Sequence, residues 1–332
     1  MGLFQPSIPP LPAGIDLSGQ TVVVTGASSG IGRAAARRIL KLNASNVVLA
    51  VRDLAKGEAA KASFLADPKI QSMNPRGNIE VMLLNMESYD SVRSFVSTFK
   101  QRFSELHVLF LNAGGMPHQR EVASTGHEKG FQVMYLSNVM LMLELLSLLE
   151  STADKTGKPS RVTWSGSSSY RQTSLMRIPL PENILKYFDQ VDNISMFDRY
   201  ADTKLFGLLF LRELAKHYDS KKVIVNSFCP NTVNSNMAAY MPLYLRIPAS
   251  IFMKVKGRTP DEATSIVLNA AFVAGAETHG TLLEDCNLVQ VSNFVLSDEG
   301  GKVQKQLWSE TVHEMGQQME LPAWMIRQTD SD

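Results

Sequence analysis

The chain has 332 residues, of which 44% are hydrophobic, enough for a sizeable core in one large α/β domain or two small ones. Its 33 basic and 32 acidic residues give a formal net charge of +1, so it lacks the basic excess that binds a phosphate backbone, and no nucleic-acid partner is expected. The chain has only two cysteines, Cys229 and Cys286. This small number argues against a disulfide framework and favours a reducing compartment, so we predict a cytoplasmic location. The six histidines have no metal-ligand spacing, so no metal site is predicted.

Residues 1–16 are predicted to form an extended leader. The first twelve carry four prolines but neither a basic start nor a long apolar core, which argues against a signal peptide or a membrane anchor. A second apolar stretch, residues 139–149, is interrupted by Glu144 and is too short to span a bilayer. We predict a buried helix there.

Strand-like apolar runs alternate with helix-like segments at intervals of about 30 residues, as in repeated βα units. The predicted strands are 21–24, 46–51, 79–84, 107–111, 161–165 and 222–228, with a last strand within 281–291. The predicted helices are 33–42, a charged stretch ending at 66, 88–103, 131–149, 200–218 and 261–274, separated by a surface loop at 67–77, a long connection at 170–199 and an irregular segment at 231–257. Nearly continuous apolar strands with helices between them predict a parallel sheet covered on both faces.

Three glycines at the spacing G-x-x-x-G-x-G connect the first strand to the first helix. Gly26, Gly30 and Gly32 allow a sharp turn, the close approach of a ligand and free N–H groups that point at an anion. A dinucleotide pyrophosphate is the expected ligand. In a doubly wound sheet such ligands bind at the carboxyl ends of the strands, so functional residues are expected there.

Tyr200 and Lys204 stand four residues apart in a predicted helix, so they share one face and can reach the same ligand. An ammonium group close to a phenol favours the phenolate, which lowers the tyrosine pKa from about 10 toward neutrality. A tyrosine of this kind can act as a general acid or base.

Four motifs follow one another along the chain: the glycine run, Asn112-Ala113-Gly114, a serine-rich strand end and residues 200–206. In kind and in order they resemble the motifs of the short-chain dehydrogenase/reductase family, closest to the branch of retinol dehydrogenase-like reductases. The resemblance covers nearly the whole chain and implies an α/β fold. That fold is a single Rossmann-type catalytic domain at residues 17–320, with a doubly wound parallel sheet of about seven strands, helices on both faces and a tail at 321–332. The implied reaction is hydride transfer between a nicotinamide and a carbonyl or alcohol carbon.

The resemblance also implies the catalytic residues. Tyr200 would be the proton donor or acceptor, and Lys204 would lower its pKa and hydrogen-bond the nicotinamide ribose. Ser167 would hydrogen-bond the substrate oxygen. Its neighbours Ser165 and Ser168 are alternatives for this role, and Ser165 is the main one. Asn138 would hold a water that links Lys204 to solvent as a proton relay.

NADP(H) is the predicted cofactor. Val51 stands where the family's NAD enzymes carry an acidic residue, while Arg52 and Arg33 could converge on a 2′-phosphate. Asp53 argues in the other direction, because an inward-turned carboxylate would repel that phosphate. The cofactor-binding residues implied by the resemblance are Gly26, Ser28, Ser29, Gly30, Ile31, Gly32, Arg33, Arg52, Asn85, Met86, Asn112, Ala113, Gly114, Tyr200, Lys204, Pro230, Val233 and Ser235.

Two positions depart from the family pattern. Asn85 replaces the usual aspartate that binds the adenine amino group, although its carbonyl oxygen can still accept that hydrogen bond. Asn231 replaces the glycine that usually follows Pro230, and asparagine tolerates the left-handed conformation better than most residues.

Residues 231–257 are predicted to form a substrate loop. Because the part from 237 to 255 is apolar, we expect a lipophilic ketone, aldehyde or alcohol in a flexible pocket. The same stretch could instead pack as a helix in the core or in a dimer interface, or it could dock on a membrane surface. The sequence leaves open whether the chain forms a homodimer. The alternative function is a catalytically silent NADP-binding regulatory protein. The presence of Asn138, Ser167, Tyr200 and Lys204 together favours the enzyme.

Overall fold

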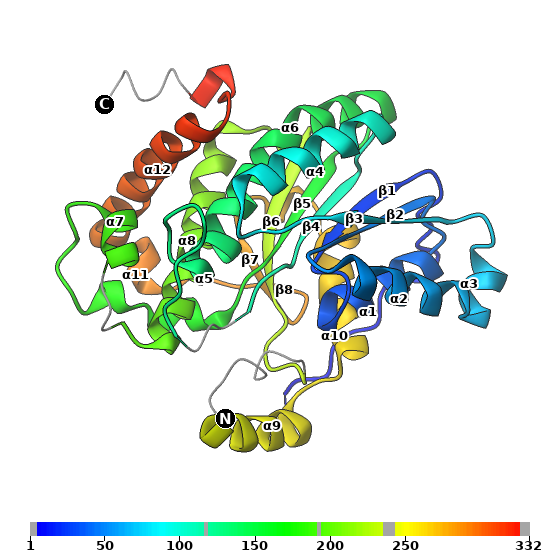
Figure 1. Cartoon of the computed structure of the whole chain (residues 1–332), viewed down its shortest axis with the longest axis horizontal. Coiled ribbons are helices and arrows are strands. Elements are labelled where there is room, and N and C mark those ends of the chain that lie inside the picture. The colour runs from blue at the N-terminus through cyan, green and yellow to red at the C-terminus, as the bar shows by residue number, and fades with distance from the viewer. Residues whose placement is uncertain (1–4, 116–118, 191–193, 235–242, 326–332) are drawn as a thin grey trace.

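The computed structural model describes residues 5–115, 119–190, 194–234 and 243–325 (Figure 1). Its centre is one eight-stranded sheet with the order β3-β2-β1-β4-β5-β6-β7-β8. Strands β1 to β7 all run in the same direction, and β8 pairs antiparallel with β7. The strands are β1 (Thr21–Thr25), β2 (Asn46–Val51), β3 (Asn78–Leu83), β4 (Val108–Leu111), β5 (Ser160–Ser165), β6 (Val223–Cys229), β7 (Leu282–Glu284) and β8 (Asn287–Leu288). The predicted doubly wound fold is confirmed.

Helices cover both faces of the sheet, because alternate strand residues point in opposite directions. Val22 and Val24 of β1 pack into one core cluster, whereas Val23 packs into the other. The first cluster includes residues of α1 (Gly30–Lys41), α2 (Leu54–Leu65) and α10 (Pro260–Leu268), and the second includes residues of α4 (Tyr89–Arg102), α6 (Ser137–Thr156) and α8 (Met196–His217). Because β1, β4 and β5 are parallel, the glycine loop after β1 and the end of β5, to which Lys204 of α8 is hydrogen-bonded, lie at the same edge of the sheet.

The helix predicted at 131–149 is longer than expected. It begins with a short turn, α5 (Lys129–Phe131), passes through a wide π-turn at Gln132–Leu136 and continues as α6. By length and composition the stretch Lys129–Thr156 could cross a bilayer, but 78% of its most apolar window is buried inside the protein. It is a core helix, as predicted.

Several segments differ from the sequence predictions. Part of the loop predicted at 67–77 is helix α3 (Pro68–Met73), which begins where Asp67 accepts a hydrogen bond from the Lys69 N–H and Pro68 occupies the first turn. The last strand predicted within 281–291 is a hairpin of β7 and β8, because Asp285 and Cys286 both adopt positive φ and turn the chain back. The remaining helical segments are α7 (Ile184–Gln190) and the turns Ser168–Gln172 and Ser174–Met176 in the predicted connection, α9 (Leu243–Lys256) in the segment predicted to be irregular, a π-turn at Asn269–Val273, the turn Ala276–Thr278, α11 (Asn293–Leu296) and α12 (Asp298–Gln318).

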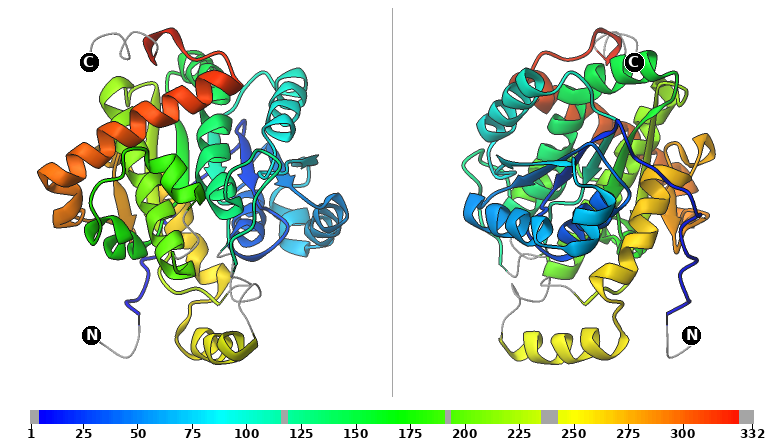
Figure 2. Two further views of the ribbon diagram at one scale, coloured as in Figure 1. Left: turned by 60° about the vertical axis from the view of Figure 1, so that its left-hand side comes forward. Right: turned by 90° about the vertical axis from the view of Figure 1, so that its right-hand side faces the viewer.

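The long helix α12 crosses the outer side of α8 (Figures 1 and 2). Trp308 stacks on Phe210 with 5.0 Å between the ring centroids. The Gln304 side chain donates a 2.5 Å hydrogen bond to Glu213 of α8. The C-terminal part of the chain thus buries the helix that carries Tyr200 and Lys204.

Candidate active site at the carboxyl ends of the strands

The glycine loop has the geometry of an anion site. Gly26 and Gly30 adopt positive φ angles of 68° and 52°, so the chain turns sharply from β1 into α1. Ser29 caps α1 with an extended backbone, and its side chain makes no capping hydrogen bond. The first turn of α1 also contains no acidic side chain, so its N–H groups, including those of Ile31 and Gly32, keep the partial positive charge of a helix N-terminus. A phosphate group fits this place.

The loop is held tightly against the end of β4. The Thr25 hydroxyl accepts hydrogen bonds from the backbone N–H groups of Asn112 (2.8 Å) and Ala113 (2.9 Å), and the Asn112 side-chain amide donates to the Thr25 carbonyl at 2.9 Å. A Cβ on Gly32 would lie 2.6 Å from both the Gly26 carbonyl oxygen and the Asn112 amide nitrogen. Only glycine fits there without a shift. The structure thus brings Gly26, Gly32, Asn112 and Ala113 together, and the resulting cradle fits a dinucleotide.

The charged residues after β2 point in several directions. Asp53 caps α2, where its carboxylate accepts a 3.1 Å hydrogen bond from the Lys56 N–H. The Arg52 guanidinium pairs with Glu87 at 2.5 Å, and the exposed Arg33 donates to the Ser63 hydroxyl at 2.9 Å. The Asp53 carboxylate is therefore engaged with the first turn of α2. The two arginines are each held by a neighbour, and a 2′-phosphate would have to compete with Glu87 for Arg52.

The end of β3 supplies Asn85 and Met86. The Asn85 side-chain oxygen accepts a 3.1 Å hydrogen bond from the Glu87 N–H and keeps a second lone pair. The Met86 side chain is buried in the core, and its carbonyl accepts a 2.6 Å hydrogen bond from the Ser137 hydroxyl at the start of α6. Gly114, after β4, is packed against Met134, whose Cγ would lie 3.1 Å from a Cβ.

Three of the four predicted catalytic residues lie together. The Tyr200 phenol is hydrogen-bonded to Ser167, which follows β5 and caps the next helical turn. The Lys204 Nζ donates a 2.7 Å hydrogen bond to the Ser165 carbonyl and lies 5.4 Å from the centroid of the Tyr200 ring. The geometry thus distinguishes the two serines, because Ser167 presents its hydroxyl to Tyr200 while Ser165 positions Lys204 through its backbone.

The ionisation of this pair differs from the prediction. Burial raises the pKa of Tyr200 to about 12, although the hydrogen bond with Ser167 lowers it. Burial also lowers the pKa of Lys204 to about 8. Since Lys204 lies over the ring and bonds to the Ser165 carbonyl, desolvation outweighs the expected stabilisation of the phenolate. At neutral pH Tyr200 is therefore protonated and can act as an acid.

Asn138, the fourth predicted catalytic residue, lies in α6. It is fully buried at the start of α6, where its side-chain amide donates a 2.9 Å hydrogen bond to the Val133 carbonyl in the π-turn. Its Oδ1 has no hydrogen-bond partner within the described residues. A buried acceptor without a partner is a place where a water can bind.

The segment after β6 completes the site. Asn231 adopts φ +56°, which confirms that asparagine takes the left-handed conformation here, and its amide donates to Asp285 at 3.0 Å. The Pro230 carbonyl accepts a 3.3 Å hydrogen bond from Arg258, and Val233 is buried and pairs with the backbone of Arg258. Ser235 lies outside the described residues.

The sequence assigned no role in the site to Ser169, Gln172, Thr232 and Cys229, which also shape it. A cavity of about 240 Å³ lies beside Ser167 and is lined by polar side chains: Ser167, Ser168, Ser169, Gln172, Asn231 and Thr232. The buried thiol of Cys229 accepts hydrogen bonds from the N–H groups of Ser168 (3.1 Å) and Asn231 (3.4 Å), and so joins the two loops. Burial raises the pKa of this thiol.

Asp202 is a further position that the sequence left unassigned. It lies inside the Tyr200–Lys204 motif, and its carboxylate accepts hydrogen bonds from the Thr173 hydroxyl (2.6 Å) and from the backbone N–H (2.7 Å) and hydroxyl (2.5 Å) of Ser174. This carboxylate fixes the chain that follows Ser167 onto α8. The sequence signal for this role is the acidic residue between Tyr200 and Lys204, and its burial is seen in the structure.

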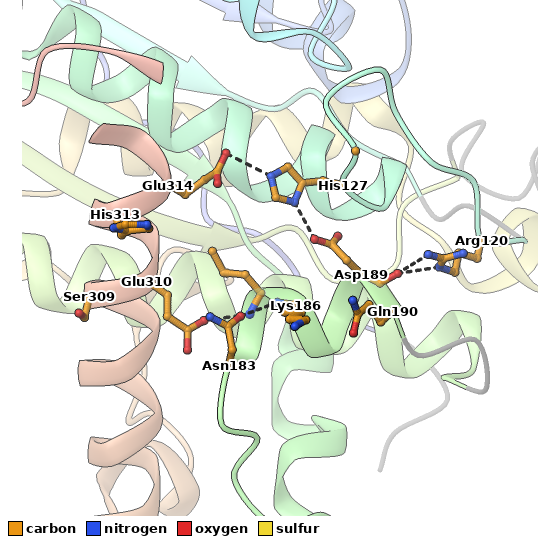
Figure 3. A pocket seen from close by; sticks show the side chains of 12 residues that line it. Arg120, His127, Asn183, Lys186, Asp189, Gln190, Ser309, Glu310, His313 and Glu314 are labelled. Atoms are coloured by element: carbon orange, nitrogen blue, oxygen red, sulfur yellow. Dashed lines mark hydrogen bonds and ion pairs between the residues drawn. The ribbon is translucent and has the colours of Figure 1, made fainter. Parts of the chain in front are cut away.

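A larger cavity, about 580 Å³, opens between α7, α12 and the loop before α5, and contains none of the predicted site residues (Figure 3). His127 lines this cavity and lies between two carboxylates, 2.7 Å from Asp189 of α7 and 3.2 Å from Glu314 of α12. These two carboxylates raise the pKa of His127 to about 9, against the opposing effect of burial. Across the described part of the chain, no group of three or more His, Cys, Asp or Glu side chains could hold a metal ion.

Comparison with known proteins places these features in context. A sequence model described as short chain dehydrogenase matches residues 20–158. The short chain dehydrogenase yanD of Aspergillus niger is 43% identical over 322 residues, which cover 96% of this chain and 98% of that protein. Two solved structures share the fold at about 20% identity. They are the NADH-dependent reductase A1-R′ complexed with NAD (TM-score 0.58, 20% identity, 81% of this chain and 95% of that one) and the RhlG/NADP active-site complex of Pseudomonas aeruginosa (TM-score 0.59, 23% identity, 82% and 97%).

Proposed function

The chain belongs to the short-chain dehydrogenase/reductase family, and from this premise we propose that it is an NADPH-dependent oxidoreductase acting on a lipophilic small molecule. At the level of the family, it is an oxidoreductase that uses a nicotinamide cofactor and a small carbonyl or alcohol substrate. The retinol dehydrogenase-like branch stays a prediction, since the relatives share only the wider family name.

The observation that carries the proposal is the contact of Ser167, Tyr200 and Lys204 beside a cavity at the carboxyl ends of β5 and β6. When bound, the nicotinamide supplies or accepts the hydride, so the chain has to supply position and a proton. The Ser167 hydroxyl can donate a hydrogen bond to a substrate carbonyl oxygen in that cavity. Tyr200, protonated at neutral pH, then delivers the proton to the same oxygen as negative charge develops on it.

Lys204 has two tasks in this proposal. Its positive charge close to the Tyr200 ring favours loss of the phenolic proton, and its hydrogen bond to the Ser165 carbonyl fixes its position. After transfer, Tyr200 has to recover a proton. The Asn138 Oδ1, for which the described part of the chain offers no hydrogen-bond partner, supports the proposed water that would begin this relay.

The test is NADPH oxidation, followed by absorbance, with a panel of lipophilic aldehydes and ketones. We expect Tyr200→Phe to lower kcat by at least about 100-fold, the usual contribution of a general acid, while NADPH still binds. Tyr187→Phe, in α7, is the matched control and should keep its activity. If NADPH binds but neither the unmodified chain nor the control oxidises it with any substrate, the silent NADP-binding protein becomes the better proposal.

The preference for NADPH is supported by Arg52 and Arg33, by the buried Val51 at the position of the expected acid, and by the engagement of Asp53 with α2. Arg52→Ala should raise the KM for NADPH by about 10-fold and leave the KM for NADH unchanged, since one charge-assisted hydrogen bond contributes about 1.5–3 kcal/mol. Arg76→Ala is the control. Equal KM changes for both cofactors, or a faster rate with NADH in the unmodified chain, would contradict NADPH specificity.

The remaining parts of the proposal concern the setting of the protein. The two free thiols support a cytoplasmic, reducing compartment. The apolar residues of α9 support a lipophilic substrate. Most of their described side chains are exposed, however, and none lines the polar cavity beside Ser167, in contrast to the predicted apolar pocket. A homodimer through α8 is not favoured, because α12 of the same chain packs on that helix. Self-association would therefore need another face.

A further inference from the structure

Helix α9 presents an apolar face to solvent. Tyr244, Ile247, Ile251, Phe252 and Val255 are each more than half exposed, and Tyr244 reaches 74%. Successive members of this set are three, four, one and three residues apart, which places all five side chains on one side of the helix. Figures 1 and 2 show α9 at the periphery, set apart from the helices that cover the sheet. A contiguous apolar surface of this kind marks an interaction site.

The charge of α9 is entirely positive. The helix contains Arg246, Lys254 and Lys256 and no acidic residue, although the whole chain has a net charge of only +1. Lys254 follows Ile251 by three residues and Lys256 follows Phe252 by four, so the two lysines flank the apolar face on opposite sides. Apolar side chains at the centre of a face with cations along its edges are typical of a helix that lies in the surface of an anionic membrane.

The base of α9 is attached firmly to the rim of the proposed active site. The Asn234 N–H donates to the Arg258 carbonyl at 2.8 Å, and the Arg258 N–H donates to the Thr232 carbonyl at 3.0 Å. The backbone that precedes α9 is thus paired with the backbone that follows it. The Gln5 side chain bonds to the carbonyls of both Thr232 and Lys256, at 2.8 Å each. Thr232 also lines the cavity beside Ser167, so the C-terminal end of α9 is held close to that cavity.

We propose that α9 docks this protein, parallel to the surface, on an anionic lipid membrane. The charge pattern favours this occupant over a second copy, which would carry the same positive helix to the contact. The area agrees. A 14-residue helix is about 21 Å long and about 10 Å wide, so its face covers roughly 200 Å², far below the roughly 800 Å² per partner of a stable dimer. Docking would place the entrance of the active site at the depth where lipophilic molecules accumulate.

Vesicle flotation of the full chain tests the proposal without requiring turnover. We expect weak binding to phosphatidylcholine vesicles and stronger binding when about 30% phosphatidylserine is included, with loss of the difference at high salt. Lys254→Gln should weaken binding to the phosphatidylserine vesicles about fivefold, the effect of one cation near such a surface. The double variant Ile251→Ser/Phe252→Ser should weaken binding at least about tenfold.

The matched control is Leu65→Ser/Met73→Ser, which removes two large apolar side chains, 50% and 55% exposed, from α2 and α3. This control should float like the unmodified chain, and far-UV circular dichroism should show all variants folded. The proposal is wrong if the unmodified chain stays away from both vesicle types, or if the α9 double variant floats as well as the control. A dimer in sedimentation that the α9 variant dissociates, without vesicle binding, would assign the face to a second copy. Tyr200→Phe should float normally, so that a failure of the proposed activity would leave this result intact.

Discussion

The ion cluster around His127 makes the stability of the fold depend on pH. His127 lies 2.7 Å from Asp189 of α7 and 3.2 Å from Glu314 of α12, and it precedes the helix that contains Asn138. The same Asp189 accepts a 2.8 Å hydrogen bond from the Glu128 N–H, and Glu314 accepts one from the Tyr89 hydroxyl at 3.1 Å. Protonated His127 therefore joins three separate segments through one partly buried charge.

The size of its contribution follows from the pKa. The folded protein holds the pKa of His127 at about 9, compared with about 6.5 in an unfolded chain. The raised value means that the folded state binds the proton more tightly, which contributes about 3 kcal/mol of stability below pH 6.5. This contribution decreases as the pH rises through the interval from about 6.5 to about 9, and it is absent above that interval.

The assay is urea unfolding at pH 6.0, 7.5 and 9.5, for the unmodified chain and for His127→Gln. Glutamine cannot take up the proton, so the difference in free energy of unfolding between the two proteins should shrink by about 3 kcal/mol from pH 6.0 to pH 9.5. His313→Gln, on the exposed side of α12, is the control and should show a small difference at each pH. A difference for His127→Gln that stays constant across this range would refute the reasoning, because the cluster would then hold the segments together without the charge.

Three further outcomes are expected. Carbonyl reduction should slow as the pH rises through about 8, where Lys204 loses the charge that assists Tyr200, and Lys204→Arg should shift this limb of the kcat/KM profile to higher pH. Asp202→Asn should lower kcat and the melting temperature but not the affinity for NADPH, because the amide cannot accept all three hydrogen bonds that hold the loop after Ser167, as titration and calorimetry would show. Gly32→Ala should cost about 1–3 kcal/mol in urea unfolding and weaken NADPH binding, whereas Gly301→Ala, with nothing within 4 Å, should be neutral or slightly stabilising.

The parallel sheet and the proximity of the motifs could be predicted, because both follow from short-range patterns. The apolar runs around Val22 and Val47 are long enough to mark buried strands, and the carboxyl ends of parallel strands meet at one edge. The spacing of Tyr200 and Lys204 placed them on one face of a helix. The ionisation of the pair could not be predicted in this way, since it depends on burial by loops that are distant in sequence.

The helices that were not predicted show two different reasons for failure. Helix α3 has readable signals, Asp67 as its cap and Pro68 in its first turn, which were outweighed by the prolines and the glycine of the predicted loop. Helix α9 contains Pro248, which normally argues against a helix interior. Its apolar residues are exposed in the structure, whereas the sequence alone would place residues of this type in a core.

Helix α12 shows why the surroundings of the candidate active site depend on contacts distant in sequence. Gln304 and Trp308 pack on α8 about 90 residues earlier in the chain, while Glu314 reaches His127 in the loop before α5. The helix that carries Tyr200 and Lys204 is thus enclosed between the sheet and the C-terminal segment. Because protein interiors are close-packed, a change in the position of α12 alters the packing of α8. A proton on His127, more than 70 residues from Tyr200 in sequence, therefore helps to determine how firmly the proposed catalytic helix is held.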